Sequence, residues 1–305
     1  MKKSTLPGLL LIFSLSVSYA QKPQLLNKED SLKYGWWTRN TQLAANLSGS
    51  AFSQNWQGGG INNIVLGGVF ANKADFFKGK GVWTNDIQLQ LGTLSNYSKD
   101  KPRETRKNLD RLFAETKYAK KINAKTNWFV GATLLSQMIK GYDYSNDKLP
   151  IISNFFAPAF FTQGVGLEYK PKPYFFISLG GATLRQTVVA NQKVWDSEYY
   201  KTSDKVFGVE KGKKLRLEGG FQAVAAFDKN LTPKLNLKWR WQTFSPYTFK
   251  AFDHNVSAMA TYKLNKYINL NATVLGIYDW DQTGPKDLKP WQINGGANLG
   301  FAVQL

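Results

Sequence analysis

Hydrophobic and polar residues alternate with a period of two along much of this chain. In the segment Leu235–Gln242, every odd position is apolar and every even position is polar. A helix of this sequence would scatter Lys238 and Arg240 around all of its sides, whereas a strand gathers them on one face. The same alternation recurs in 214–228, 267–279 and 291–305. The pattern predicts an all-β chain in which each strand has one apolar and one polar face.

About twelve segments have this character, and most exceed the ~5–6 residues typical of strands in soluble proteins. They reach the ~9–11 residues that a tilted strand needs to cross a bilayer. In the first strand Arg39 falls on the apolar face, and the second strand has no clean polar face. The predicted strands are 36–51, 60–71, 81–94, 109–121, 126–139, 156–169, 174–188, 214–228, 233–244, 254–264, 267–279 and 291–305.

The predicted connections alternate between short and long. A soluble β-sandwich also alternates its side chains, but short turns at one end and long loops at the other are typical of outer-membrane barrels. The sequence therefore predicts a single antiparallel transmembrane β-barrel of about 12 strands, with short periplasmic turns and long extracellular loops. The short turns fall at 121–125, 169–173, 228–233 and 264–267, and the long segments at 95–108, 140–155, 189–213, 245–253 and 280–290.

Aromatic residues cluster near the predicted strand ends. Such residues form girdles at the two membrane interfaces of a barrel. Aromatics in a sandwich core would lie mid-strand instead, as Trp239 and Trp241 partly do. The candidate girdle residues are Trp36, Trp37, Trp83, Trp128, Tyr169, Tyr174, Phe244, Tyr247, Tyr278, Trp280 and Trp291.

The first 20 residues have the pattern of a secretory signal peptide. Lys2 and Lys3 are followed by nine apolar-rich residues, Leu9–Val17, and by the small-x-small site Ser18–Ala20. The apolar core is too short to span a bilayer, and no later run approaches the ~18 apolar residues of a membrane helix. We expect a signal peptide cleaved after residue 20, a periplasmic lead-in at 21–34 and a barrel domain at 35–305. Export and the barrel pattern together predict the outer membrane of a Gram-negative bacterium.

Composition removes several kinds of chemistry. The chain has no Cys and one His, which excludes disulfides, thiolate metal sites, a lipidated N-terminus, and sites built from several histidines. Its formal charge is +19, and loss of Lys2 and Lys3 would leave +17. This balance suits an anionic partner, and export argues against nucleic acid. We expect no cofactor and no metal.

The polar faces of the predicted strands carry charges of both signs. They would form a lumen lined by Lys and Arg that favours anions, or they would pair across strands and fill the lumen. Arg216, Lys238, Arg240 and Lys263 lie on three consecutive strands, with Glu218 as the nearest acid. The remaining candidate lumen residues are Asp86, Arg111, Glu115, Lys117 and Asp279.

Three further features invite a functional interpretation. The first hairpin carries Asn55, Trp56, Gly58, Gly59 and Gly60, which suits either turn chemistry or a loop folded into the lumen. The charged segment 99–107 is predicted to be a solvated external loop, with attraction to lipopolysaccharide as the sharper hypothesis. His254 and Ser257 would point to opposite faces of one strand, so they cannot form a catalytic pair, and we expect no enzyme.

Several motifs together resemble a known family. They are the segments 52–60, 155–160, 164–171, 217–220, 262–268 and 277–279. With these motifs the chain resembles, over nearly its whole mature length, the Bacteroidota outer-membrane barrel family catalogued as domain of unknown function 3078. Gly180-Gly181-Ala182 departs from the Ser-Pro pair expected there. The resemblance implies an outer-membrane barrel and supplies no catalytic residue.

The sequence thus predicts a passive or gated channel for small solutes, with anions as the candidate class. The alternative is a structural or accessory subunit of an outer-membrane assembly, export or uptake complex, with a plugged lumen. The expected partners are outer-membrane lipid and lipopolysaccharide, a small anionic solute, and an outer-membrane protein.

Overall fold

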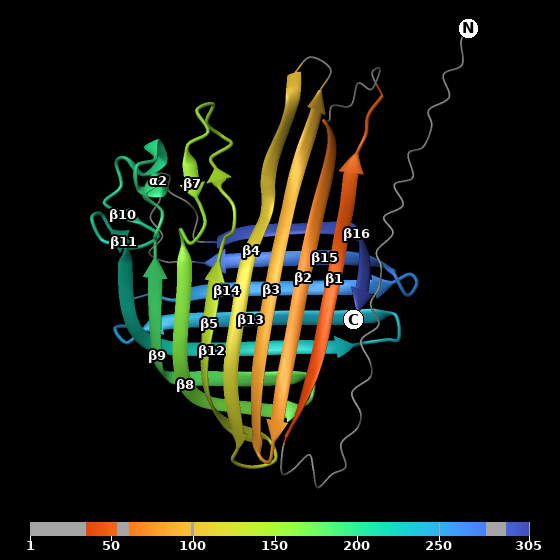
Figure 1. The fold of residues 1–305 in the computed structure, drawn as a ribbon, viewed down its shortest axis with the longest axis vertical. Coiled ribbons are helices and arrows are strands. Elements are labelled where there is room, and N and C mark those ends of the chain that lie inside the picture. The colour runs from red at the N-terminus through yellow and green to blue at the C-terminus, as the bar shows by residue number, and fades with distance from the viewer. Residues whose placement is uncertain (1–34, 54–60, 99–100, 250, 279–290, 305) are drawn as a thin grey trace.

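The computed structural model describes residues 35–53, 61–98, 101–249, 251–278 and 291–304. Twelve antiparallel strands close into one barrel, in the order β1-β16-β15-β14-β13-β12-β9-β8-β5-β4-β3-β2. Each strand thus pairs with its neighbour in sequence, and β1 pairs with β16 to close the ring. In Figure 1, β1–β4 run nearly vertically in front, and β12–β16 cross steeply behind them, as strongly tilted strands of one barrel do.

The all-β fold class with about twelve antiparallel strands is confirmed. The barrel strands are β1 Trp36–Ser50, β2 Asn62–Lys78, β3 Gly81–Ser98, β4 Lys101–Lys121, β5 Thr126–Ser136, β8 Ala159–Lys172, β9 Phe175–Val188, β12 Leu215–Asn230, β13 Leu235–Pro246, β14 Asp253–Lys263, β15 Ile268–Tyr278 and β16 Trp291–Gln304.

The alternation decides which side chains face out. Leu179, Leu217 and Ile293 are 60%, 60% and 73% exposed on the outer face. Soluble proteins seldom expose large apolar residues over a whole surface, so this face suits a lipid environment. Arg39 lies on the same side, close to the ring of Trp37 at 6.0 Å, which agrees with its predicted position on the apolar face.

Five short turns lie together at one end of the barrel. They join β2 to β3, β4 to β5, β8 to β9, β12 to β13, and β14 to β15. The turn after β2 is only Gly79–Lys80, and Gly79 has a φ of +56°, a conformation that favours glycine. Longer connections leave the opposite end after β1, β5, β9 and β15, so the predicted alternation is present except between β3, which ends at Ser98, and β4, which begins at Lys101.

One predicted loop is wrong. Residues 95–108 extend β3 and β4 into a long hairpin, except for 99–100, which lie outside the described residues. Two charges of this segment find partners along β4: Arg106 contacts Glu104 at 2.7 Å, and Lys107 contacts Asp110 at 3.0 Å. A strand that extends into water needs no apolar face. The extensions of β3 and β4 therefore lack the alternation of apolar and polar residues from which the strands were predicted. Similarly, β2 continues to Lys78, seven residues past its predicted end.

Two long connections have structure of their own. The segment after β5 forms the hairpin β6 Gly141–Tyr142 and β7 Ile151–Ser153. The segment after β9 contains α2 Gln192–Trp195, the 3-10 helix η1 Glu198–Tyr200, and the hairpin β10 Lys205–Val206 and β11 Val209–Glu210. These pieces gather at one end of the barrel (Figure 1).

We call the structured segments after β5 and after β9 the loop cap. A small apolar core holds the loop cap together. Val194, Val206 and Val209 are almost fully buried beside Tyr200, whose hydroxyl donates to the carbonyl oxygen of Ile152 at 3.0 Å. Burial raises the pKa of Tyr200 above its usual range. The cap is therefore a packed unit at the loop end.

The aromatic residues lie mostly near the strand ends. At the short-turn end, outward-facing Trp37, Phe76 and Trp83 are neighbours, and Tyr118 packs on Trp128 at 5.6 Å. Phe244 is a correction to the predicted girdle. It follows outward-facing Trp241 by three positions, so it turns into the lumen and is only 4% exposed.

The barrel closes through its shortest ladder. β1 pairs with β2 over its whole length, but with β16 only from Gln42 to Leu47, against Leu299–Gln304. We call this closing ladder the seam. The seam joins β1 and β16, the first and last barrel strands of the described structure.

Candidate functional site

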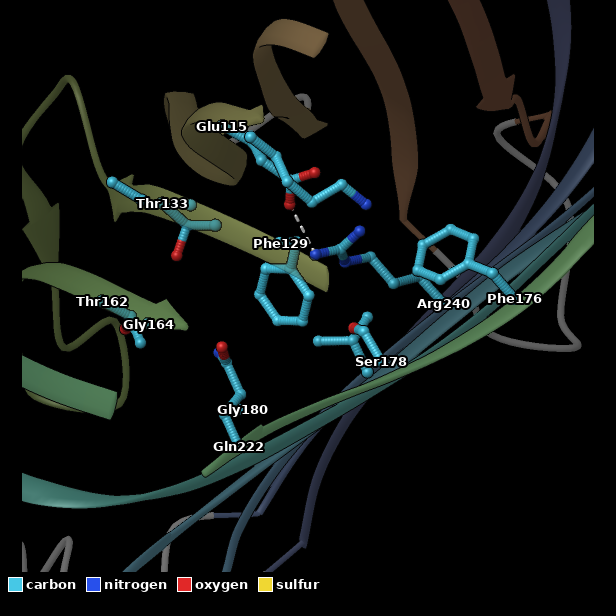
Figure 2. Close-up of a pocket in the computed structure, with 14 residues that line it drawn as sticks. Glu115, Phe129, Thr133, Thr162, Gly164, Phe176, Ser178, Gly180, Gln222 and Arg240 are labelled. Carbon is cyan, nitrogen blue, oxygen red and sulfur yellow. Dashed lines mark hydrogen bonds and ion pairs between the residues drawn. The ribbon is translucent and has the colours of Figure 1, made fainter. Parts of the chain in front are cut away.

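An ion pair crosses the lumen of the barrel. Arg240 on β13 and Glu115 on β4 are 2.7 Å apart, from Nη2 to Oε2. The two strands are far from adjacent in the barrel order, so their side chains can meet only through the interior. Figure 2 shows the contact, with Arg240 and Glu115 extending toward one another from separate walls. This pair also fixes which face of every strand points inward.

Aromatic side chains surround the pair. The Arg240 and Arg111 guanidinium carbons lie 5.8 Å and 4.6 Å from the ring centre of Phe113. Phe129 and Phe176 line the same space (Figure 2). The remaining cavity is about 30 Å³, enough for roughly two water molecules. This part of the lumen is filled.

Asp86 and Arg111 join the pair through an amide. Asp86 lies opposite Glu115 in the β3–β4 register. Gln88 donates to Asp86 at 3.0 Å and accepts from Arg111 at 2.9 Å. The two neighbouring carboxylates thus face two guanidinium groups across a short distance.

A second ion pair extends this network along the wall. The Lys117 ammonium contacts Glu168 on β8, and Asn127 donates to the other oxygen of Glu168 at 3.1 Å. Glu168 is buried. We define the central ion-pair cluster as Asp86, Arg111, Glu115, Lys117, Glu168 and Arg240.

The other candidate lumen residues have separate neighbours. Arg216 contacts Glu218 at 2.6 Å, two positions along β12. Lys238 lies 3.6 Å from Asp228 near the short turns, and both are half exposed. Lys263 points inward at the last position of β14, where it is exposed. These residues are therefore distributed along the lumen rather than gathered at one site.

The sequence interpretation missed several charged lumen residues, among them Glu168, Arg185 and Asp253. Arg185 on β9 forms an ion pair with Asp253 on β14, close to the loop end. The ring centres of Phe160 and Phe244 each lie 5.2 Å from the guanidinium carbon, beside a cavity of about 120 Å³. Alternation alone would have placed Glu168 inside, because its sequence neighbours Leu167 and Tyr169 are outward apolar residues.

The strands around the seam line the lumen differently. Within the described residues, the inward positions of β15, β16 and β1 carry no charged side chain. Asn294 and Gly296 there are exposed, and a Cβ atom added at Gly296 would meet nothing within 4 Å. We call this lining the uncharged arc. Its amide and small side chains are Asn40, Gln42, Asn46, Ser48, Asn271, Thr273, Gln292, Asn294, Gly296 and Asn298.

His254 lies outside the lumen. Its ring is among Trp241, Tyr278 and Trp291 on the outer face, with centroid distances of 5.6 to 6.1 Å. Ser257 pairs with Arg240 in the register and faces inward, so the two side chains point apart as expected. Among the residues that the structure describes, none offers a hydrogen-bond partner to the buried His254 Nδ1.

Some predicted features lie outside the described residues. They are the signal peptide and lead-in at 1–34, the motif residues Asn55, Trp56, Gly58, Gly59 and Gly60, and Asp279. Over the described ranges, no three acidic or histidine side chains come together in a way that could hold a metal ion. Within the same ranges, no helix is both long and apolar enough to span a membrane.

The fold and lining define a class: closed antiparallel barrels with an apolar outer face and a polar lumen. The family described as "Protein of unknown function (DUF3078)" matches residues 47–142. The resemblance expected from the sequence motifs is thus confirmed for this part of the chain. No curated protein matches the chain.

The chain also matches solved structures at low sequence identity, and three of them are a channel, a transporter and a porin. An outer membrane channel from Pseudomonas putida F1 has 10% identity and a TM-score of 0.41, covering 88% of this chain and 95% of that one. The toluene transporter TodX of Pseudomonas putida has 7% identity and a TM-score of 0.30, covering 91% and 93%. An anion-selective porin from Comamonas acidovorans has 8% identity and a TM-score of 0.31, covering 89% and 100%.

Proposed function

We propose that this protein is a non-enzymatic outer-membrane barrel that acts as a passive channel for small hydrophilic solutes. The uncharged arc of β15, β16 and β1 is the pathway, and the central ion-pair cluster is the fixed wall opposite it. The observation that carries the proposal is the free space in front of Gly296, where an added Cβ atom would meet nothing within 4 Å. The Asn294 side chain beside it reaches toward β4, with Nδ2 3.5 Å from the carbonyl oxygen of Asn108. Amide and hydroxyl groups there can replace the water that a polar solute loses.

The lining also bears on selectivity. Arg240, Lys117, Arg185, Arg216 and Lys238 each lie within ion-pair distance of a carboxylate. These cations are therefore largely neutralised, and the lumen as a whole does not supply a strong anion preference. Arg111 and Lys263 belong to none of the described ion pairs. Because their positive charges can attract anions, the proposal includes a weak preference for small anions.

One observation favours a second candidate function. The Arg240–Glu115 bridge and its aromatic neighbours obstruct a large part of the lumen. A barrel of about twelve strands is narrow to begin with, between filled barrels of ~8 strands and open ones of ~16. If the uncharged arc were also closed, the barrel would be a structural or accessory subunit of an outer-membrane complex.

Conductance of the purified protein in planar bilayers separates the two functions. If the protein is a channel, the current should rise in discrete steps. In a salt gradient, the reversal potential should be small and of the sign expected for anion selectivity. We expect Gly296→Trp, which places an indole in the free space, to reduce conductance several-fold. Gly68→Trp is the matched control, because Gly68 also has free space but lies on the outer face.

The outcomes are distinct. Absence of conductance from the folded wild-type protein would exclude the channel, and co-purification of a stoichiometric membrane protein would then support the accessory subunit. Conductance that Gly296→Trp leaves unchanged would show a channel whose route avoids the uncharged arc.

A further inference from the structure

The five short turns are uniformly basic. Each carries two or three lysines, all of them exposed and none replaced by arginine. We call them the short-turn lysines. They are Lys78 and Lys80; Lys120, Lys121 and Lys125; Lys170 and Lys172; Lys229 and Lys234; and Lys266, whereas Lys263 of the last turn points into the lumen and is not counted among them.

These lysines are almost free of local counter-charge. Asp228 is the one acidic residue in the five turns, and it lies 3.6 Å from Lys238 of the lumen wall. The connection between β9 and β12 at the opposite end is different, since acids accompany its lysines. Lys201 contacts Glu198 at 3.1 Å, and Lys213 contacts Glu210 at 2.7 Å. The short turns therefore carry more unbalanced positive charge than this connection does.

An aromatic belt lies directly beside the lysines. The Lys229 ammonium is 4.6 Å from the ring centre of Tyr174, and that of Lys266 is 4.7 Å from Tyr267. Outward Trp83 and Trp128 lie near the same end. Tyr and Trp side chains take the headgroup level of a bilayer, and lysine stems extend from there to the phosphates.

The distribution of the lysines favours a surface over a compact partner. The turns follow one another around the barrel from β2–β3 to β14–β15, and every one is basic. A protein docked on one side could reach only some of them, whereas a bilayer leaflet surrounds them all. Lysine is also a point charge without the fixed fork of arginine, which suits many loose phosphate contacts.

We propose that the short-turn lysines bind the headgroup phosphates of anionic phospholipids in the leaflet that surrounds the short turns. This interaction rests on the membrane location in the proposed function, but not on the channel. The lysines would hold the barrel at a fixed depth and would enrich negatively charged lipid around this end.

The test compares lipid retention by two charge variants. Full-length protein is reconstituted in vesicles of phosphatidylcholine mixed with phosphatidylglycerol, and the two lipids that remain bound after detergent extraction are quantified by mass spectrometry. The turn variant is K78Q/K80Q/K120Q/K121Q/K125Q. The matched control, K193Q/K201Q/K205Q/K211Q/K213Q, removes the same charge from the loop cap. Heat-modifiable migration in phosphatidylcholine vesicles confirms folding of each.

We expect wild-type protein to retain phosphatidylglycerol several-fold over phosphatidylcholine, with the preference weakening as salt rises. The turn variant should lose most of this preference, and the control should keep it. Equal retention of both lipids by wild-type protein would overturn the proposal, as would an equal loss in the two variants. Wild-type salt dependence gives an answer even if the turn variant does not fold. Conductance is measured separately, so failure of the channel would leave this result intact.

Discussion

Arg240 and Glu115 are 125 positions apart in the chain, and their side chains form one hydrogen-bonded ion pair through the middle of the barrel. Both are mostly removed from solvent, with side-chain exposures of 25% and 13%. Such a pair contributes little net stability compared with apolar residues, but loss of one partner leaves a buried charge uncompensated.

We therefore expect Arg240→Met to lower the free energy of unfolding by about 3 kcal/mol. The double variant Arg240→Met/Glu115→Gln should recover more than half of that loss, because no unpaired carboxylate remains. Denaturant titration of the folded barrel in lipid vesicles measures both. A double variant as unstable as the sum of the two singles would show that the residues are not energetically coupled.

The seam should be where the barrel opens first on heating, because its ladder is the shortest. Ala45 pairs with Phe301 across it. The disulfide of Ala45→Cys/Phe301→Cys should raise the temperature of the heat-modifiable gel shift by several degrees. Since the chain has no cysteine, the two introduced residues can pair only with each other within one molecule.

The control cross-link joins β2 and β3 through Gly68→Cys/Leu91→Cys, in the middle of a long ladder. It should have a much smaller effect, because that ladder stays paired until the barrel unfolds. A larger stabilisation from the control than from the seam would place the first opening elsewhere.

His254→Phe should stabilise the barrel by about 1 kcal/mol, since it removes a buried nitrogen without a partner in the described structure and keeps an aromatic ring. Conductance should not change, because the ring lies on the outer face with Trp241 and Trp291. Thermal unfolding and conductance of the same preparation check both. A loss of function at unchanged stability would reopen the question of an active site.

The loop cap should weaken as pH rises above about 10, the ordinary pKa of tyrosine. Because burial raises the pKa of Tyr200, the packed side chain stays neutral while that of the opened cap loses its proton. The unfolded form then binds fewer protons than the folded form, so stability falls with increasing pH. The measurement is the rate at which a protease that tolerates alkaline pH cleaves the loop cap, and this rate should increase as the pH rises.

Tyr200→Phe is the matched variant for that experiment. It should weaken the cap by about 1 kcal/mol at neutral pH, through loss of the hydrogen bond to Ile152. It should also lack most of the extra protease sensitivity at alkaline pH. The same pH response in both proteins would assign the effect to another group.

Much of the fold is predictable from local alternation. The segment Leu235–Gln242 is a strand with the expected inward Lys238 and Arg240, since a period of two needs no knowledge of distant residues. The extension of β3 and β4 was not predictable in this way. Outside an apolar environment, residues such as Glu104 and Arg106 pair along a strand without leaving an apolar face.

The lumen partners were less predictable than the lumen faces. Glu218 is close to Arg216 in sequence, and it is indeed its ion-pair partner. Glu115 could not be assigned to Arg240, because the contact depends on how the barrel closes and how wide it is. The lysines of the short turns were visible in the sequence, and the structure adds that they are exposed.

The two strands of the seam, β1 and β16, are also two of the three strands of the uncharged arc. These two strands are also the first and last of the barrel, so they meet only when every hairpin between them has paired. A partly assembled barrel would already contain the ion-paired wall but would have no enclosed route beside it. Permeability would then be the final step of folding, and the onset of conductance would report that assembly is complete.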